Sequence, residues 1–376
     1  MDAGPDVGGG AGEVRVVSHA PAGFGLAVRL PLLALGMVAL VAGVAGGLAR
    51  LGGHALLPGA TAAWHGPLMI GAFFGTVISL ERAVALGARW AYAAPLAAGL
   101  GGVGLIALDD PRPAQGLLLA ASVLLTIASV RLAARTTALF TITLALAAAC
   151  WAVGNVAWLA GGNLPAIVPW WMAFLVLTIA GERLELTRLM RPSRARQVAF
   201  ASIVAALLGA CAIALLATEL GWRLLGVALV ALTAWLLLQD IARRTAREPG
   251  LTGYIGRCLL AGYVWLGIGG LLLIGPGAAY ATFAWDAAAH AILLGFVFSM
   301  VFGHAPVIVP AVARAKVPYH WSFYVPLALL HLSVAERVLG DLVANPSVRA
   351  AGATLSALAL VVFIATLLTA IVRGRA

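Results

Sequence analysis

Apolar runs, each about 20 residues long, follow one another along this whole chain. Breaks at glycine, proline and charge clusters separate them. Backbone polar groups in lipid must be bonded internally, and the alternation typical of strands is missing, so the runs can only be helices. We therefore expect an all-α, polytopic transmembrane bundle of about twelve helices, at residues 26–49, 60–86, 90–108, 115–134, 138–160, 166–189, 198–217, 222–240, 254–274, 284–313, 321–339 and 350–372.

The composition excludes a soluble protein. Hydrophobic residues make up 62% of the chain and charged residues only 10%, whereas soluble domains carry about a quarter charged residues. The net charge of +10 lies mostly in short loops between the runs, which is typical of membrane orientation rather than of nucleic-acid binding. Three scattered cysteines, Cys150, Cys211 and Cys258, form no CxxC-like pair, which argues against a disulfide framework or a thiolate metal site.

The basic residues also predict the orientation of the chain. If the segments alternate in direction, 19 of the 24 Lys and Arg residues lie on the side of the two termini and 5 on the opposite side. This bias places both termini in the cytoplasm of a multi-pass protein of the bacterial inner (plasma) membrane. Residues 1–22 are rich in Gly and Ala and lack the pattern of a removed signal peptide. We expect a disordered tail there and a single transmembrane domain over residues 23–376.

Four histidines fall inside the predicted segments, where ionisable side chains are costly and usually functional. His290 and His304 share the tenth segment and lie about 21 Å apart along a helix. The predicted topology places His65 and His290 at one depth near the outer face, and His304 and His331 at a second depth nearer the cytoplasm. Met300 lies one turn before His304 on the same helix face.

Imidazole nitrogens from facing helices are common ligands of haem iron and of copper. We therefore predict that His65 and His290 ligate one centre, and that His304 ligates or lines a second centre with His331 or Met300. The alternative is that each histidine makes an interhelical hydrogen bond and that Met300 packs in the core.

Two further patterns concern charge and helix continuity. Glu-Arg recurs at residues 81–82, 182–183 and 336–337, and adjacent residues on a helix point in different directions, so each pair should meet partners on other helices. The alternative interpretation is that these are interfacial charges. Pro306 and Pro310 are expected to kink or break the tenth helix.

Three stretches resemble the NnrS family: FGLAVRLPLLAL (residues 24–35), AAWHGPLMIGAFFGTVISL (62–80) and HAILLGFVFSMVFGH (290–304). NnrS proteins are haem- and copper-containing membrane proteins associated with nitric oxide and denitrification, and their helix count resembles that of the heme-copper oxidase main subunit. The resemblance implies metal-binding positions at His65, His290 and His304, with Met300 beside them. His331 is not part of the resemblance. The adjacent histidine pair of an oxidase copper centre is missing here.

The sequence thus predicts an integral membrane protein with haem, b-type by preference, and with copper as an option. Its partners would be the lipid bilayer and either a small diatomic gas or an electron donor, in denitrification or nitrosative stress, with no nucleic acid. Whether it is an enzyme is left open, since two axial ligands favour electron transfer and an open position favours nitric oxide or oxygen. The alternatives are a proton-coupled secondary transporter of a small solute using Glu182 or Glu336, and a metal-delivery factor.

Overall fold

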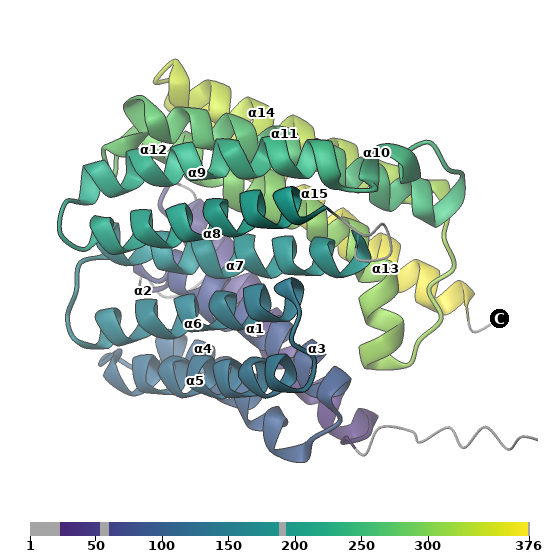
Figure 1. The fold of residues 1–376 in the computed structure, drawn as a ribbon. Helices are drawn as coiled ribbons and strands as arrows, with labels where there is room; N and C mark the ends of the chain where they lie inside the picture. The colour runs from purple at the N-terminus through teal and green to yellow at the C-terminus, as the bar shows by residue number, and fades with distance from the viewer. Residues whose placement is uncertain (1–22, 53–59, 188–192, 375–376) are drawn as a thin grey trace, which may run out of the picture.

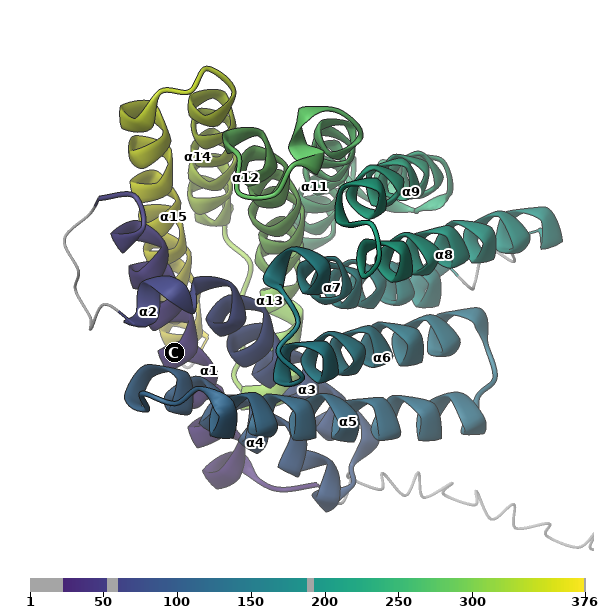
Figure 2. The ribbon, with the colours of Figure 1, turned by 90° about the vertical axis from the view of Figure 1, so that its left-hand side faces the viewer.

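The computed structural model describes residues 23–52, 60–187 and 193–374; the predicted tail at residues 1–22 lies outside this part of the chain. Within it every regular element is a helix (Figures 1 and 2). The elements are α1 (Leu26–Ala49), α2 (Ala60–Ala63), η1 (Pro67–Phe74), α3 (Gly75–Leu86), η2 (Arg89–Tyr92), α4 (Ala93–Ala107), α5 (Arg112–Arg135), α6 (Leu139–Leu159), α7 (Leu164–Thr187), α8 (Arg194–Ala214), α9 (Thr218–Gln239), α10 (Ala242–Thr245), α11 (Gly250–Ile274), η4 (Pro276–Ala278), α12 (Phe283–His290), η5 (Ala291–Phe298), α13 (Ser299–Ala313), η6 (Trp321–Phe323), α14 (Tyr324–Leu342) and α15 (Pro346–Arg373).

The predicted all-α bundle of about twelve membrane-crossing segments is confirmed. Twelve helical stretches of the described chain are long and apolar enough to cross a bilayer, and each falls on one predicted segment. The tenth combines α12, η5 and α13 into one span over Phe283–Ala313. Consecutive spans pack against each other, most extensively α14 with α15 and α6 with α7, as short connections between antiparallel neighbours require.

Helix α7 lies at the centre of the bundle. Of the twelve spans in the described residues it is the most enclosed, with 78% of its most apolar stretch buried. It packs against α6 and α8, its neighbours in sequence, and against the more distant η1, η5 and α9. Figure 2 shows α7 between the hairpins of the first half of the chain and those of the second. The second and tenth spans therefore meet beside it.

Both of these spans change to π-helical geometry immediately after a histidine. His65 precedes η1 by two residues, and His290 is the residue before η5. Pro67 begins η1, and its ring and missing N–H disturb the hydrogen-bond ladder of an α-helix. Such π segments occur frequently at functional sites because they rotate the side chains that follow them.

Of the two outcomes predicted for Pro306 and Pro310, a kink or a break in the tenth helix, the break does not occur. Helix α13 runs without interruption from Ser299 to Ala313 and contains both prolines. A proline inside a transmembrane helix is tolerated where neighbouring groups satisfy the freed backbone. The departure from α-helical geometry in this span lies upstream, in η5.

The two ends of the described chain lie at the same end of the bundle. At the start of α1, Arg29 Nη1 donates a hydrogen bond to the carbonyl of Ala311 (3.4 Å). Beyond α15, Gly374 packs closely against Lys316 and Pro318. Residues 311–318 comprise the end of the tenth span and the connection that follows it, so both ends of the described chain lie on one side of the bundle. That this side is cytoplasmic remains a prediction from the basic residues.

Asn155 provides a test of the packing around α7. Its side chain donates to the Leu118 carbonyl on α5 (3.0 Å) and accepts from Trp171 Nε1 on α7 (3.1 Å). We expect Asn155→Leu to lower the thermal unfolding midpoint in detergent and to cost roughly 1–2 kcal/mol, because it leaves Trp171 Nε1 without its acceptor in the bundle. The neighbouring Val156 is 53% exposed to the bilayer side, so Val156→Leu is the matched control and should have no measurable effect. Equal midpoints for the two variants would contradict this role of Asn155.

Candidate metal centre and its charged surroundings

The structure brings His65 and His290 together. Their ring centroids lie 6.3 Å apart and the ring planes differ by 15°. Two imidazoles bound in line to one metal, with metal–nitrogen distances of about 2.0–2.1 Å, have centroids about 6 Å apart. The spacing therefore matches a metal placed between the two rings.

Backbone carbonyls hold both rings by the same nitrogen. His65 Nδ1 lies 2.7 Å from the Gly43 carbonyl of α1, and His290 Nδ1 lies 2.9 Å from the Asp286 carbonyl of α12. A proton on each Nδ1 leaves Nε2 as the unprotonated nitrogen, which is the usual arrangement of a histidine that ligates a metal. No hydrogen bond from another described residue reaches Nε2 of either ring.

A glycine on α1 makes room for the first ring. A Cβ added to Gly47 would lie 2.9 Å from both Cε1 and Nδ1 of His65, closer than such atoms approach in proteins. Any side chain at this position would push the His65 ring away from its place beside Gly43 and His290.

Both histidines line one cavity of about 180 Å³ between the first, second, sixth, tenth and twelfth spans. Most of its wall is apolar, with Met69, Leu175 and Phe298 among the lining side chains. Three arginines, Arg50, Arg337 and Arg349, also line it. The volume of the cavity is below the range of about 300–1,000 Å³ typical of small-molecule sites. A metal ion therefore fits directly, whereas a macrocycle requires flexible side chains such as Met69 to move.

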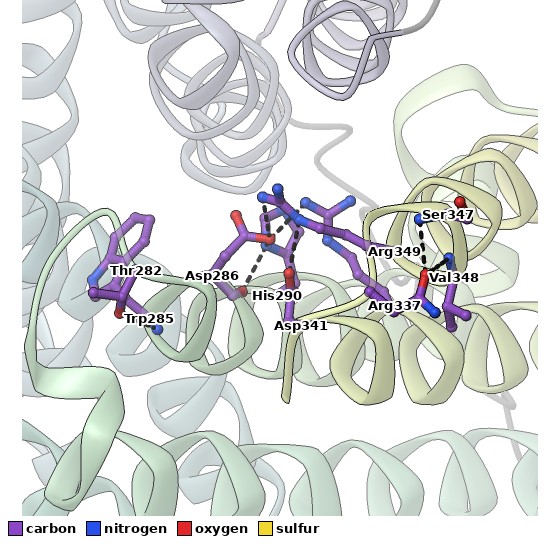
Figure 3. Close-up of polar contacts among 10 residues, drawn as sticks. Thr282, Trp285, Asp286, His290, Arg337, Asp341, Ser347, Val348 and Arg349 are labelled. Carbon is purple, nitrogen blue, oxygen red and sulfur yellow. Dashed lines mark hydrogen bonds and ion pairs between the residues drawn. The ribbon is translucent and has the colours of Figure 1, made fainter. Parts of the chain in front are cut away.

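A buried ionic network surrounds His290 (Figure 3). Asp286 Oδ2 lies 3.4 Å from His290 Nδ1 and accepts from Arg337 Nη2 at 2.8 Å. It also lies 3.2 Å from Arg349 Nη2, and Arg349 Nε lies 2.7 Å from Asp341 Oδ1. The Asp341 oxygens and Arg349 Nε lack a well-directed hydrogen bond, so we regard this last contact as an ion pair only.

The network contains two carboxylates and two guanidinium groups, which compensate one another. The Asp341 side chain is fully buried, and Arg337 is 8% exposed. Charges removed from water persist only when they are paired. The network therefore fixes the carboxylate of Asp286 beside His290 and fixes two cationic groups at the wall of the cavity.

Both ring nitrogens of His304 bond to other groups of the bundle. Its Nε2 lies 2.8 Å from Arg183 Nη2 of α7, and its Nδ1 lies 2.7 Å from the Met300 carbonyl. Because a guanidinium can only donate, Nε2 accepts and Nδ1 donates. In this arrangement neither nitrogen is available to a metal.

His331 lies apart from His304. Its Nδ1 accepts a hydrogen bond from Trp265 Nε1 of α11 (3.0 Å), and no ring contact or hydrogen bond between His304 and His331 occurs in the described chain. Met300 is 3% exposed and lies where α11 and α13 meet, one turn from His304. No group of three or more His, Cys, Asp or Glu side chains in the described residues is placed to hold a metal. The structure thus brings His65 and His290 together and does not join His304 to His331, whereas Met300 and His304 line one cavity. Ligation of a metal by any of these residues stays a prediction.

Sequence reasoning missed Asp286 and the role of Arg349. Asp286 lies four residues before His290, a spacing that places both on one helix face, and this was the available signal. The Glu-Arg pattern did point to partners on other helices, and this is confirmed for two arginines: Arg183 binds His304 and Arg337 binds Asp286. Nothing local to Arg349 indicated that α15 contributes to the same network.

Comparison with known proteins places the chain in a family. The model of the family described as "Domain of unknown function (DUF8744)" matches residues 29–372, and the chain belongs to this family. A search of curated proteins found no match.

Asp286→Asn tests the ionic network. Removal of the carboxylate charge leaves Arg337 and Arg349 without a shared counter-ion, and we expect a loss of about 3–5 kcal/mol of stability, measured as a lower thermal unfolding midpoint in detergent. The exposed pair of Arg223 and Glu219 (2.6 Å) provides the control. Glu219→Gln should change stability by less than about 1 kcal/mol. A small effect of both substitutions would show that the network does not hold the bundle together.

Proposed function

We propose that this member of the DUF8744 family is an integral membrane haem protein that handles electrons, with His65 and His290 as the two axial ligands. The observation that carries the proposal is the pair of nearly parallel imidazoles, 6.3 Å between centroids, with each Nδ1 held by a backbone carbonyl. Haem would supply one-electron chemistry at this site.

The surroundings of the pair support an amphipathic ligand. The cavity wall is mostly apolar, as the ring of a haem requires, and Arg50, which also lines it, provides a cationic group that suits its carboxylate edge. The Asp286 carboxylate lies beside His290 Nδ1, where it fixes the orientation of the ring and increases its basicity. The resemblance to the NnrS family supports the same assignment of His65 and His290.

Two axial histidines favour electron transfer over the binding of a gas. Nitric oxide or oxygen would need one ligand position, and both imidazoles are held in place on the protein side by Gly43 and Asp286. Copper is the alternative occupant, because imidazole ligands also suit this metal and the cavity is small.

The absorption spectrum and metal content of the purified protein test the proposal. We expect a Soret band that shifts on reduction and that carbon monoxide leaves unchanged. His65→Ala and His290→Ala should each abolish it, because one axial ligand is lost. His331→Ala, which changes a histidine bonded to Trp265, is the matched control and should retain the full band.

The other outcomes separate the competing functions. Stoichiometric copper that is lost in the same two variants would show that copper, and not haem, occupies this site. A colourless, metal-free preparation of folded protein would contradict the proposal and favour a secondary transporter. A haem band that survives both substitutions would contradict the assignment of the ligands.

A further inference from the structure

A second cavity lies deeper in the bundle, on the side of the membrane that holds both chain ends. Its volume is about 520 Å³, within the range of small-molecule sites. It lies between the first, second, sixth, tenth and twelfth spans, and nearly all of its wall is apolar. Leu30 of α1 and Leu368 of α15 line it and are 47% and 55% exposed, so the cavity is open to the hydrocarbon of the bilayer between these helices.

Two carboxylates interrupt this apolar wall. Glu81 of α3 and Glu182 of α7 both line the cavity, and they are close enough to repel each other electrostatically. Neither makes a hydrogen bond or a close ion pair with another described residue. Carboxyl groups in an apolar environment need hydrogen-bond partners. A ligand in the cavity could provide them for Glu81 and Glu182.

The charges around these carboxylates disfavour an anionic ligand. Arg82 and Arg183 follow the two glutamates in sequence, and these two arginines and the carboxylate of Glu185 act on them electrostatically. Arg183 is 3% exposed and binds His304, which also lines the cavity. Because three carboxylates meet only two guanidinium groups, the cluster has no excess of positive charge to attract an anion.

The two cavities share one wall. Phe74, Leu175, Phe298 and Leu360 line both of them, and the rings of Phe74 and Phe298 pack edge to face at 5.3 Å. A molecule in the second cavity is thus one layer of side chains away from the cavity of His65 and His290.

We propose that the second cavity binds a lipid-soluble quinone, with its ring toward Glu81 and Glu182 and its isoprenoid tail toward the opening between α1 and α15. A quinone is neutral and enters from the bilayer. Its ring oxygens can form a hydrogen bond with a carboxyl group that is either protonated or ionised. The carbonyl of the oxidised form accepts from a protonated carboxyl, and the hydroxyl of the reduced form donates to a carboxylate. An acyl chain would use the apolar wall but would leave both carboxyl groups without a partner. The proposal concerns binding alone and does not depend on haem at the outer site.

Binding of a quinone with a ten-carbon tail to the full-length protein in detergent tests this inference. We expect saturable binding, measured by equilibrium dialysis, at about one molecule per chain. Glu182→Leu should weaken it roughly tenfold, because a hydrogen bond to the ring oxygen is lost. Val301→Trp fills the cavity and should abolish binding, whereas Leu332→Trp, on a 61% exposed position that lines neither cavity, should bind like the unchanged protein.

Several results would overturn the inference. They are an absence of saturable binding, equal binding of a ten-carbon alcohol without the ring, and quinone affinity unchanged in Glu182→Leu. Each variant is first checked for a monodisperse size-exclusion profile, and Glu182→Leu, which removes the carboxyl group with little change in size, keeps the test valid if Val301→Trp does not fold. His65→Ala should bind the quinone normally, so the result is independent of the haem spectrum.

Discussion

The cost of a charge in the membrane determines how this bundle is held together. Asp286, Arg337, Arg349 and Asp341 come from three helices, and each is stable inside the bundle only because the others are there. Since α12, α14 and α15 must meet for these pairs to form, the tenth, eleventh and twelfth spans are fixed in relation to one another. This arrangement also fixes the position of the His290 ring, because its Nδ1 lies beside Asp286.

The two π-helical segments connect this frame to the candidate sites. Each begins just after one histidine of the outer pair, and η1 and η5 both pack against the enclosed α7. The aromatic residues at their ends, Phe74 and Phe298, form the wall between the two cavities. The two π segments thus have the histidine pair at one end and the wall of the deeper cavity at the other. Such segments tend to occur at functional sites.

The two histidines predicted at the inner depth show why depth in the membrane alone does not identify which residues contact each other. His304 and His331 lie on neighbouring spans at comparable predicted depth, yet Arg183 and Trp265 bind them separately. A depth estimate gives the position along the membrane normal and leaves the direction around each helix axis open. The outer pairing succeeded because His65 and His290 both lie where the second and tenth spans meet beside α7.

The sequence alone determined the membrane class, the twelve spans and the histidine that faces His290, because hydropathy and depth are properties of successive residues. It also indicated, through the Glu-Arg pattern, that Arg183 and Arg337 reach other helices. Only the tertiary structure decided that Asp286 is the counterpart of Arg337 near His290, that Arg349 joins it from α15, and that α13 continues through its two prolines. These depend on which helix faces meet, and helix rotation follows from the packing of the whole bundle.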